Sequence, residues 1–247
     1  MNKIGIIGFG FVGQAIYSSI KDTEGVVVYD KFKKGYNSFD KLFECDYLFI
    51  CLPTPTDDEG QNTEAFEGIM NKLYSKSFKG VCIIKSTILP TEIEKWTDRL
   101  SVIANPEFLN QNSANEDFKN QSFILLGGNT VDCCKVREMY KEAFNFTADY
   151  HITSIQEAMD FKYIHNIYHA YNVLFWNYVQ ENFNNSRKHV SLYEKIYGKK
   201  PILSQIAPDG KLGYGGACFP KDIKAMDFNK PHELTKFMNQ YNNRLRK

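Results

Sequence analysis

The chain has 247 residues, of which 43% are hydrophobic and 24% are charged, with 30 Lys plus Arg against 29 Asp plus Glu. This composition is typical of a globular protein, and the length predicts one large domain or two small ones. The nearly balanced charge argues against a nucleic-acid-binding protein, which would normally carry a basic excess.

The six cysteines form no C-x-x-C pair, and residues 1–9 have neither the basic region nor the cleavage site of a signal peptide. We therefore expect reduced thiols in a cytoplasmic protein. No apolar stretch approaches the ~18 residues that a membrane-spanning helix needs.

The first half of the chain alternates apolar runs with amphipathic stretches. The expected strands are 3–8, 25–30, 47–52, 81–85, 101–104 and 123–126, and the expected helices include 12–20, 64–74 and 91–100. Apolar strands separated by helix-length segments predict a parallel sheet covered on both faces. The expected fold class is therefore α/β, with a Rossmann-type, doubly wound and mostly parallel sheet in a domain at 1–152.

An all-α domain at 153–247 is expected to follow, built on one long central helix. Residues 154–183 contain no Gly or Pro, and Ser154 with Glu157 forms a capping-box pattern at the start. This helix is apolar on most faces, so it must be buried on all sides. Because so short a chain can hardly cover it, we expect a second subunit, most simply in a homodimer. Shorter helices are expected at 191–197, 221–228 and 232–244.

A dinucleotide-binding pattern lies between the first expected strand and helix. Gly8, Gly10 and Gly13, with Phe9, Phe11 and Val12 between them, form G-x-G-x-x-G, and Asp30 ends the next strand. The glycines permit a tight turn, close approach of the backbone to a pyrophosphate, and close helix–strand packing. A carboxylate at Asp30 would accept the ribose hydroxyls and repel a 2′-phosphate, which favours NAD over NADP.

Residues 213–222 (GYGGACFPKD) form a second candidate site. The glycines allow close backbone approach to a ligand, and Pro220 suits the start of a helix. Cys218 would then lie just before a helix N-terminus with Lys221 near it, and both features lower a thiol pKa. A single cysteine of this kind is also often a small buried hydrophobic residue.

Two further pairs lie on the long helix, each four residues apart and so on one face. Lys162 could hold an oxygen that Asn166 orients, although a solvated lysine on a polar helix surface is the simpler reading. His165 and His169 could bind a metal, but no third ligand is evident, so we expect no metal site.

Together these motifs resemble the UDP-glucose/GDP-mannose dehydrogenase family, especially its UDP-glucose 6-dehydrogenases, along nearly the whole chain. Further similar segments are 52–56 (LPTPT), 85–87 (KST) and 105–109 (NPEFL). The long helix matches the family's spacing at Lys162, Asn166, Ala170, Phe175 and Asn177. The Phe-Pro-Lys-Asp ending at 219–222 favours the UDP-glucose branch.

The resemblance implies that NAD oxidises the C6 alcohol of a sugar nucleotide twice, to a carboxylate. Cys218 would form the thiohemiacetal and thioester, Lys162 and Asn166 would stabilise oxyanions, and Glu107 would be the general base. Asp222 and Thr87 would hold the catalytic water. Implied cofactor contacts are Gly8, Phe9, Gly10, Phe11, Val12, Gly13, Asp30, Pro53, Thr54, Thr56 and Thr87. Implied substrate contacts are Glu107, Phe108, Leu109, Lys162, Asn166, Tyr214, Gly215, Gly216 and Cys218.

The chain also departs from the family pattern. The family continues into a further domain that grips the UDP, whereas this sequence stops at Lys247, and a glutamate often found four residues after the NPEFL glutamate is Gln111 here. Substrate identity is therefore less determined than the reaction.

Two other functions stay open. The chain could be a dehydrogenase of a smaller alcohol or hydroxy acid, releasing one NADH per substrate. It could also be an NAD-binding subunit that is inactive without a separate UDP-binding chain. For the family, the expected role is glucuronate supply for polysaccharide biosynthesis.

Overall fold

The computed structural model describes residues 2–36, 38–57, 59–198, 207 and 209–247. They form two compact units. The first unit comprises the residues up to Pro55 together with Asn62–Lys162, and the second comprises Thr56–Gln61 together with Tyr163–Lys247. The long helix α6 (Ile155–Asn182) begins in the first unit and continues into the second.

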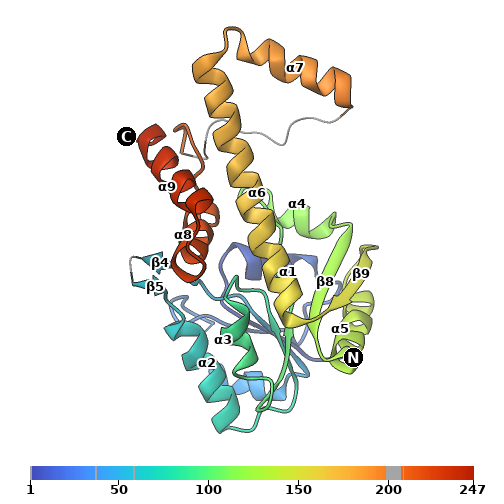
Figure 1. The fold of residues 1–247 in the computed structure, drawn as a ribbon. Coiled ribbons are helices and arrows are strands. Elements are labelled where there is room, and N and C mark those ends of the chain that lie inside the picture. The colour runs from blue at the N-terminus through green and yellow to red at the C-terminus, as the bar shows by residue number, and fades with distance from the viewer. Residues whose placement is uncertain (1, 37, 58, 199–206, 208) are drawn as a thin grey trace. The chain divides into compact units, whose positions relative to one another are not determined.

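A seven-stranded sheet forms the centre of the first unit (Figure 1). Its order is β2-β1-β3-β6-β7-β8-β9. All neighbouring pairs are parallel except β7 and β8, so β8 and β9 run opposite to the other five strands. The strands are β1 (Ile4–Ile7), β2 (Val27–Tyr29), β3 (Tyr47–Ile50), β6 (Val81–Ile84), β7 (Ser101–Ala104), β8 (Phe123–Gly128) and β9 (Asp149–Thr153).

The central strands are apolar throughout because both faces of the sheet are covered. Along β3, Leu48 and Ile50 enter one hydrophobic cluster, whereas Tyr47 and Phe49 enter the other. This alternation follows from the two-residue period of a strand. The continuous apolar runs seen in the sequence are therefore doubly buried strands.

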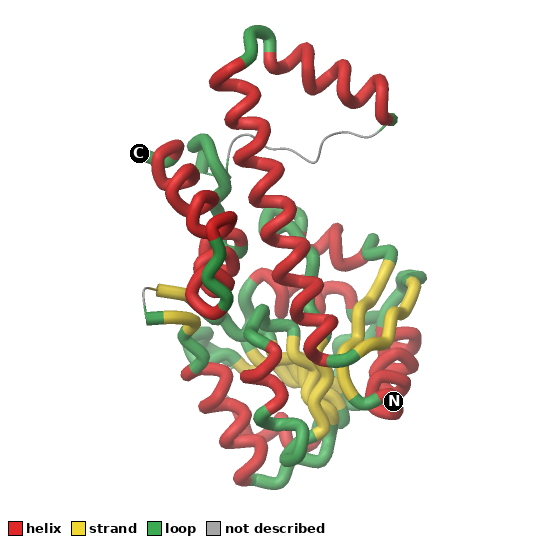
Figure 2. Tube along the Cα trace, viewed as in Figure 1, coloured by secondary structure: helices red, strands yellow, loops and turns green. Residues whose placement is uncertain are grey.

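Helices of the first unit cover the two faces (Figure 2). One cluster contains side chains of α2, α3 and the first turns of α6, and the other contains side chains of α1, α4 and α5. The bounds are α1 (Phe11–Ser19), α2 (Glu64–Ser75), α3 (Pro90–Glu94), α4 (Ala114–Lys119) and α5 (Thr130–Ala143), with a 3₁₀ helix at Phe39–Glu44.

The second unit is helical apart from a short hairpin of β4 (Thr56–Asp57) and β5 (Gly60–Gln61). Its helices are the greater part of α6, with α7 (Ser186–Tyr197), α8 (Phe219–Asn229) and α9 (Glu233–Leu245). Its small core joins Ala170, Val173 and Leu174 of α6 to Tyr214, Ile223 and Met238.

Large apolar side chains of α6 stay exposed on one side. Ile164 is 61% exposed and Tyr168 is 60% exposed. They belong to a stripe at alternating spacings of three and four residues, which we call the α6 stripe: Phe161, Ile164, Tyr168, Tyr171, Phe175 and Tyr178. This spacing places the six side chains along one side of the helix. Within the described residues, part of the apolar surface of α6 is therefore exposed, although the sequence predicts that this helix is buried on all sides.

The predicted fold class is confirmed, with three local differences. Strand β9 was not predicted, since its sequence (DYHIT) is half polar, and it lies at the sheet edge beside β8. The helix expected at 91–100 is α-helical only to Glu94. The two-residue strands β4 and β5 were not predicted either, because the flanking prolines masked them. Among the described residues, no helix is both long and apolar enough to cross a membrane.

Candidate functional site

The glycine loop between β1 and α1 has the backbone that the sequence predicts. Gly8 has φ +89°, and a Cβ there would lie 2.4 Å from the Cys51 carbonyl oxygen. A Cβ on Gly13 would lie 2.1 Å from the Gly8 carbonyl oxygen. A Cβ on Gly10 would meet nothing within 4 Å, so the loop is open at the glycine that precedes α1. Gly8 and Gly13 thus serve packing, and Gly10 faces space that a ligand can fill.

Asp30 follows β2 and is held beside the same loop. Its Oδ2 accepts from the backbone N–H of Phe9 at 2.8 Å, and its Oδ1 accepts from those of Phe32 and Lys33 at 2.9 and 3.1 Å. Burial alone would raise the pKa of Asp30, but these hydrogen bonds outweigh it and lower the pKa. The carboxylate is therefore ionised and oriented.

The open loop and the ionised Asp30 fit a dinucleotide. No acidic side chain lies in the first turn of α1, and no side chain caps its N-terminus, so the helix end itself leaves its N–H groups open to a pyrophosphate. The Lys33 ammonium donates to the Phe9 carbonyl oxygen at 2.6 Å. The positions of Phe9, Phe11 and Val12 between the glycines agree with the predicted loop, but their contacts to a cofactor stay predictions.

The LPTPT and KST segments are bound to each other in the first unit. The Thr54 hydroxyl donates to the Thr87 carbonyl oxygen at 2.6 Å, and the Ser86 hydroxyl accepts from Leu52 N–H at 2.8 Å. Thr54 and Thr87 are buried, whereas Pro53 is exposed. Thr56 lies in the hairpin of the second unit, and its buried hydroxyl oxygen has no hydrogen-bond partner among the described residues.

Glu107 and Lys162 form a buried ion pair in the first unit. The Lys162 Nζ lies 3.5 Å from Glu107 Oε1, and both side chains are at most 6% exposed. Glu107 Oε2 accepts from the Leu109 N–H at 2.6 Å, and Lys162 Nζ lies 5.3 Å from the centroid of the Phe108 ring. The structure thus brings together four of the predicted substrate-site residues. Such a carboxylate can take a proton from water, and such an ammonium can hold an oxygen.

Lys85, the first residue of the KST segment, is a second buried lysine, and the sequence pattern predicts no role for it. It is 3% exposed and donates to Asn105 Oδ1 at 3.1 Å. Burial lowers the pKa of Lys85 to about 8. The signal available in the sequence was a lysine at the end of an otherwise apolar expected strand, where a solvated side chain is unexpected.

Cys218 stands directly before α8, at its N-cap position, and Pro220 lies in the first turn. This confirms the placement that the sequence predicts. The cysteine is half-buried, and all six cysteines are thiols. A helix N-terminus favours a negative charge and hence a thiolate.

Asp222, one turn into α8, is fully buried in the second unit. Its Oδ2 accepts from the Asn166 Nδ2 at 2.6 Å, and its Oδ1 pairs with the Lys221 ammonium at 2.5 Å. The structure therefore joins two predicted catalytic residues directly. Lys162 and Asn166 lie one turn apart on α6, as predicted.

The glycine loop before Cys218 is held by asparagines that the sequence did not single out for this role. The Tyr214 N–H donates to Asn242 Oδ1 at 2.7 Å, and Asn242 Nδ2 donates to the Tyr214 carbonyl at 3.1 Å. The Gly213 N–H donates to Asn177 Oδ1 at 3.4 Å. No signal marked Asn242, because it lies on an ordinary amphipathic helix far along the chain. Gly215 and Gly216 complete the loop, and Gly216 has φ +76°.

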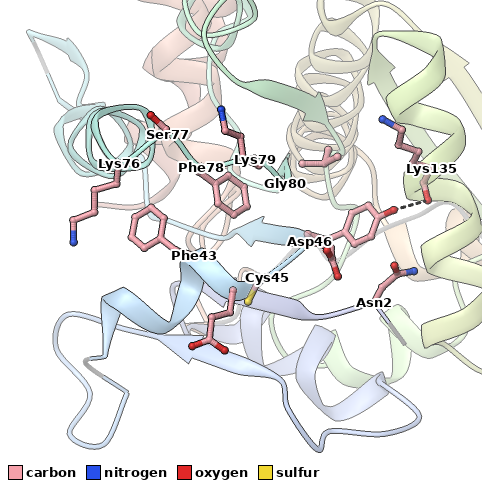
Figure 3. A pocket seen from close by; sticks show the side chains of 13 residues that line it. Asn2, Phe43, Cys45, Asp46, Lys76, Ser77, Phe78, Lys79, Gly80 and Lys135 are labelled. Carbon is pink, nitrogen blue, oxygen red and sulfur yellow. Dashed lines mark hydrogen bonds between the residues drawn. The ribbon is translucent and has the colours of Figure 1, made fainter.

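A pocket of about 450 Å³ lies at the amino ends of strands in the interior of the sheet (Figure 3). Asn2, Asp46 and Gly80 line it just before β1, β3 and β6 begin. Ligands of open α/β sheets bind at the carboxyl ends of the strands, and the predicted residues follow those ends. This pocket is therefore separate from the candidate site.

Comparison with known proteins places both halves of the chain in one family. The model of the NAD-binding domain of the UDP-glucose/GDP-mannose dehydrogenase family matches residues 26–144, and the model of that family's central domain matches residues 156–243. The chain is 27% identical to a UDP-glucose 6-dehydrogenase of Rickettsia felis, over 80% of this chain and 46% of that protein. It spans about half the length, or less, of the first curated relatives that it matches.

Solved structures show the same fold. A UDP-glucose dehydrogenase of Pyrobaculum islandicum is similar with a TM-score of 0.78 at 21% identity, covering 100% of this chain and 68% of that one. A UDP-D-ManNAc dehydrogenase of Pyrococcus horikoshii is similar with a TM-score of 0.78 at 18% identity, covering 98% and 68%. With both family models covering most of its length, the chain belongs to the UDP-glucose/GDP-mannose dehydrogenase family and carries that family's NAD-binding domain.

Proposed function

We propose that the protein is an NAD-dependent nucleotide-sugar dehydrogenase that oxidises the C6 alcohol of UDP-glucose to the carboxylate of UDP-glucuronate through Cys218. Residues 1–152 would bind NAD, and residues 153–247 would carry the nucleophile. The observation that carries the proposal is the placement of Cys218 at the N-cap of α8, one turn before a buried Asp222 paired with Asn166. The proposed nucleophile thus lies one turn from Asp222 at the start of the same helix, and Asn166 of α6 orients that carboxylate.

The glycine loop and Asp30 would hold NAD, which when bound accepts a hydride from the C6 carbon in each oxidation. Pro53, Thr54, Thr56 and Thr87 would complete the cofactor contacts. Asp30 accepts ribose hydroxyls well because it is ionised and fixed by backbone hydrogen bonds.

Covalent catalysis allows the second oxidation, because the carbon of the aldehyde intermediate is trigonal and cannot release a hydride directly. Hydride can leave only from a tetrahedral carbon, and the Cys218 thiolate supplies one by adding to the aldehyde. Lys162 and Asn166 would hold the oxygen that becomes negatively charged at each addition. Phe108, Leu109, Tyr214, Gly215 and Gly216 would shape the place of the sugar.

Hydrolysis of the thioester then needs an activated water. Glu107 is the candidate base, because its buried carboxylate is fixed by the Leu109 N–H and by Lys162. Asp222 and Thr87 would position that water. This step regenerates the Cys218 thiol and releases the acid.

Replacing Cys218 tests the proposal. Purified wild type, Cys218→Ala and Cys134→Ala would be supplied with NAD and UDP-glucose, and the carboxylate product would be measured by mass spectrometry. Cys134 is the matched control, since it is half-buried on α5 outside every motif. We expect product from wild type and Cys134→Ala within twofold of each other, and none from Cys218→Ala.

Acid formed at the wild-type rate by Cys218→Ala would refute covalent catalysis. If the wild type bound NAD but gave one NADH and no carboxylate with a smaller alcohol or hydroxy acid, that alternative would replace this function. Turnover that appears only after a second polypeptide is added would show that the chain is an NAD-binding subunit.

A further inference from the structure

The first unit buries a lysine that the proposed mechanism does not use. Lys85 follows β6, is 3% exposed, and within the described residues has one hydrogen-bond acceptor, Asn105 Oδ1 at 3.1 Å. An ammonium has three donors and is costly to bury without compensation. Its retention in the core therefore needs an electrostatic reason.

Asn105 is locked so that its oxygen faces Lys85. Its Nδ2 donates to the Leu125 carbonyl at 2.9 Å, and its Oδ1 also accepts from the Tyr140 hydroxyl at 2.6 Å. Asn105 and Tyr140 are each 1% exposed. The amide cannot turn without breaking these bonds, so Lys85 is held in one place.

The charged group that gives Lys85 a role is Glu107, which lies two residues after Asn105 in the chain. Burial lowers the pKa of Lys85; against it, electrostatic interactions with Cys51 and Glu107 raise this pKa, whereas Lys162 lowers it further. Two ammonium groups thus act on one buried carboxylate. A buried carboxylate with one cation removed is strongly destabilised.

The proposed function gives Lys162 a second task, which is to hold the oxygen of the reacting sugar. While it does so, it cannot serve Glu107 fully as a counter-charge. Lys85 cannot be diverted in this way, because it is anchored on Asn105 and enclosed.

We propose that Lys85 is a positioning residue for Glu107: anchored on Asn105, its ammonium supplies a second positive charge that holds the Glu107 carboxylate in place while Lys162 engages the substrate. The assignment of Glu107 and Lys162 rests on the proposed function. The electrostatic coupling of Lys85 to Glu107 does not, so the two can be tested apart.

A double-mutant cycle tests the coupling without any turnover. Urea unfolding would be measured at pH 7 for wild type, Lys85→Met, Glu107→Gln and the double variant. We expect the unfolding equilibrium constant of the double variant to be at least tenfold smaller than the value predicted by adding the free-energy effects of the two single substitutions. Lys79→Met, an exposed lysine just before β6, is the control and should combine additively with Glu107→Gln. Additive effects for Lys85 would overturn the proposal.

Kinetics test the consequence for the reaction. With UDP-glucose as substrate, we expect Lys85→Met to lower kcat at least tenfold while the KM for NAD stays within twofold. Tyr140→Phe removes a bond to Asn105 but keeps the Lys85 charge, and should lower kcat less than threefold. Equal losses in both variants would show a merely structural role and refute the proposal. If the wild type has no turnover, the proposed function fails, and the cycle still decides whether Lys85 and Glu107 are coupled.

Discussion

Burial of the charged Lys85 lowers the unfolding free energy, and the size of this effect depends on pH. The pKa of Lys85 is about 8 in the folded protein, against 10.5 for an ordinary lysine, because burial disfavours the charged form. Below pH 8 both states carry the proton, and the full penalty opposes folding. Between about pH 8 and 10.5 the unfolded state binds more protons, so stability rises with pH in that window.

Lys85→Met should therefore abolish this rise. We expect the unfolding free energy of wild type to increase, relative to Lys85→Met, by on the order of 2–3 kcal/mol between pH 7 and pH 10. Taking the difference between the two proteins removes the titration of tyrosines and cysteines that do not interact with Lys85. Urea unfolding across this pH range is the measurement, and a difference that does not vary with pH would contradict the burial of a charged Lys85.

Residues with a local signature could be predicted from the sequence, and residues defined by distant contacts could not. Cys218 was placed at a helix start because Pro220 follows it, and Asp30 was placed after a strand because of its spacing from Gly13. The partners of Lys85 are 20 residues away, and only the register of β6 beside β7 brings them together. Periodicity carries no information on such pairs.

Helix α6 begins where its capping residues predict. The Ser154 N–H donates to Glu157 Oε2 at 3.1 Å, and the Glu157 N–H donates to Ser154 Oγ at 3.1 Å. The Thr153 hydroxyl, the Ser154 N–H and the Ser154 hydroxyl all donate to the Glu157 carboxylate and lower its pKa to about 2. A capping box lies within four residues of sequence, which is why it can be recognised there.

The loop before Cys218 depends instead on α9. Asn242 satisfies both backbone groups of Tyr214, and the Tyr214 hydroxyl donates to Asn239 Oδ1 at 3.1 Å. Gly213 has φ +79°, and a Cβ there would lie 2.4 Å from Asn242 Oδ1. The glycine that the sequence singled out for close approach to a ligand thus also permits close approach of Asn242.

Asn242→Ala should uncouple this loop from α9. It leaves a buried N–H and a buried carbonyl without partners, so we expect a loss of roughly 2–4 kcal/mol in unfolding free energy. Asn243→Ala alters the exposed neighbour and should change it by less than about 0.5 kcal/mol. Urea unfolding monitored by circular dichroism measures both, and equal effects of the two substitutions would contradict the clamp.

For the molecule as a whole, the sequence predicted the α/β fold class because each central strand is apolar throughout and each helix of the first unit has one apolar side. It did not predict the reversed direction of β8 and β9, since strand direction depends on how the chain crosses the sheet rather than on side-chain pattern. Nor did it predict that the hairpin β4–β5 belongs with the second unit, because that membership depends on contacts such as Gln61 with Tyr163.

From the α6 stripe we predict self-association. Six large apolar side chains at three- and four-residue spacing, each more than 40% exposed, are typical of a helix that packs against another helix. We expect a homodimer at micromolar concentration, and Ile164→Asp should weaken it at least roughly thirtyfold, as for an interface hot spot. Analytical ultracentrifugation measures this, with Phe237→Asp on α9 as the control. A monomeric wild type would contradict the prediction.

Counting NADH tests the central claim most directly. Purified protein would be mixed with a limiting amount of UDP-glucose and excess NAD, and NADH formation would be followed to completion by its absorbance. Two NADH per UDP-glucose, with UDP-glucuronate as the product, is the result that we predict from Cys218-dependent double oxidation. One NADH per sugar, or none while NAD binding is retained, would contradict it.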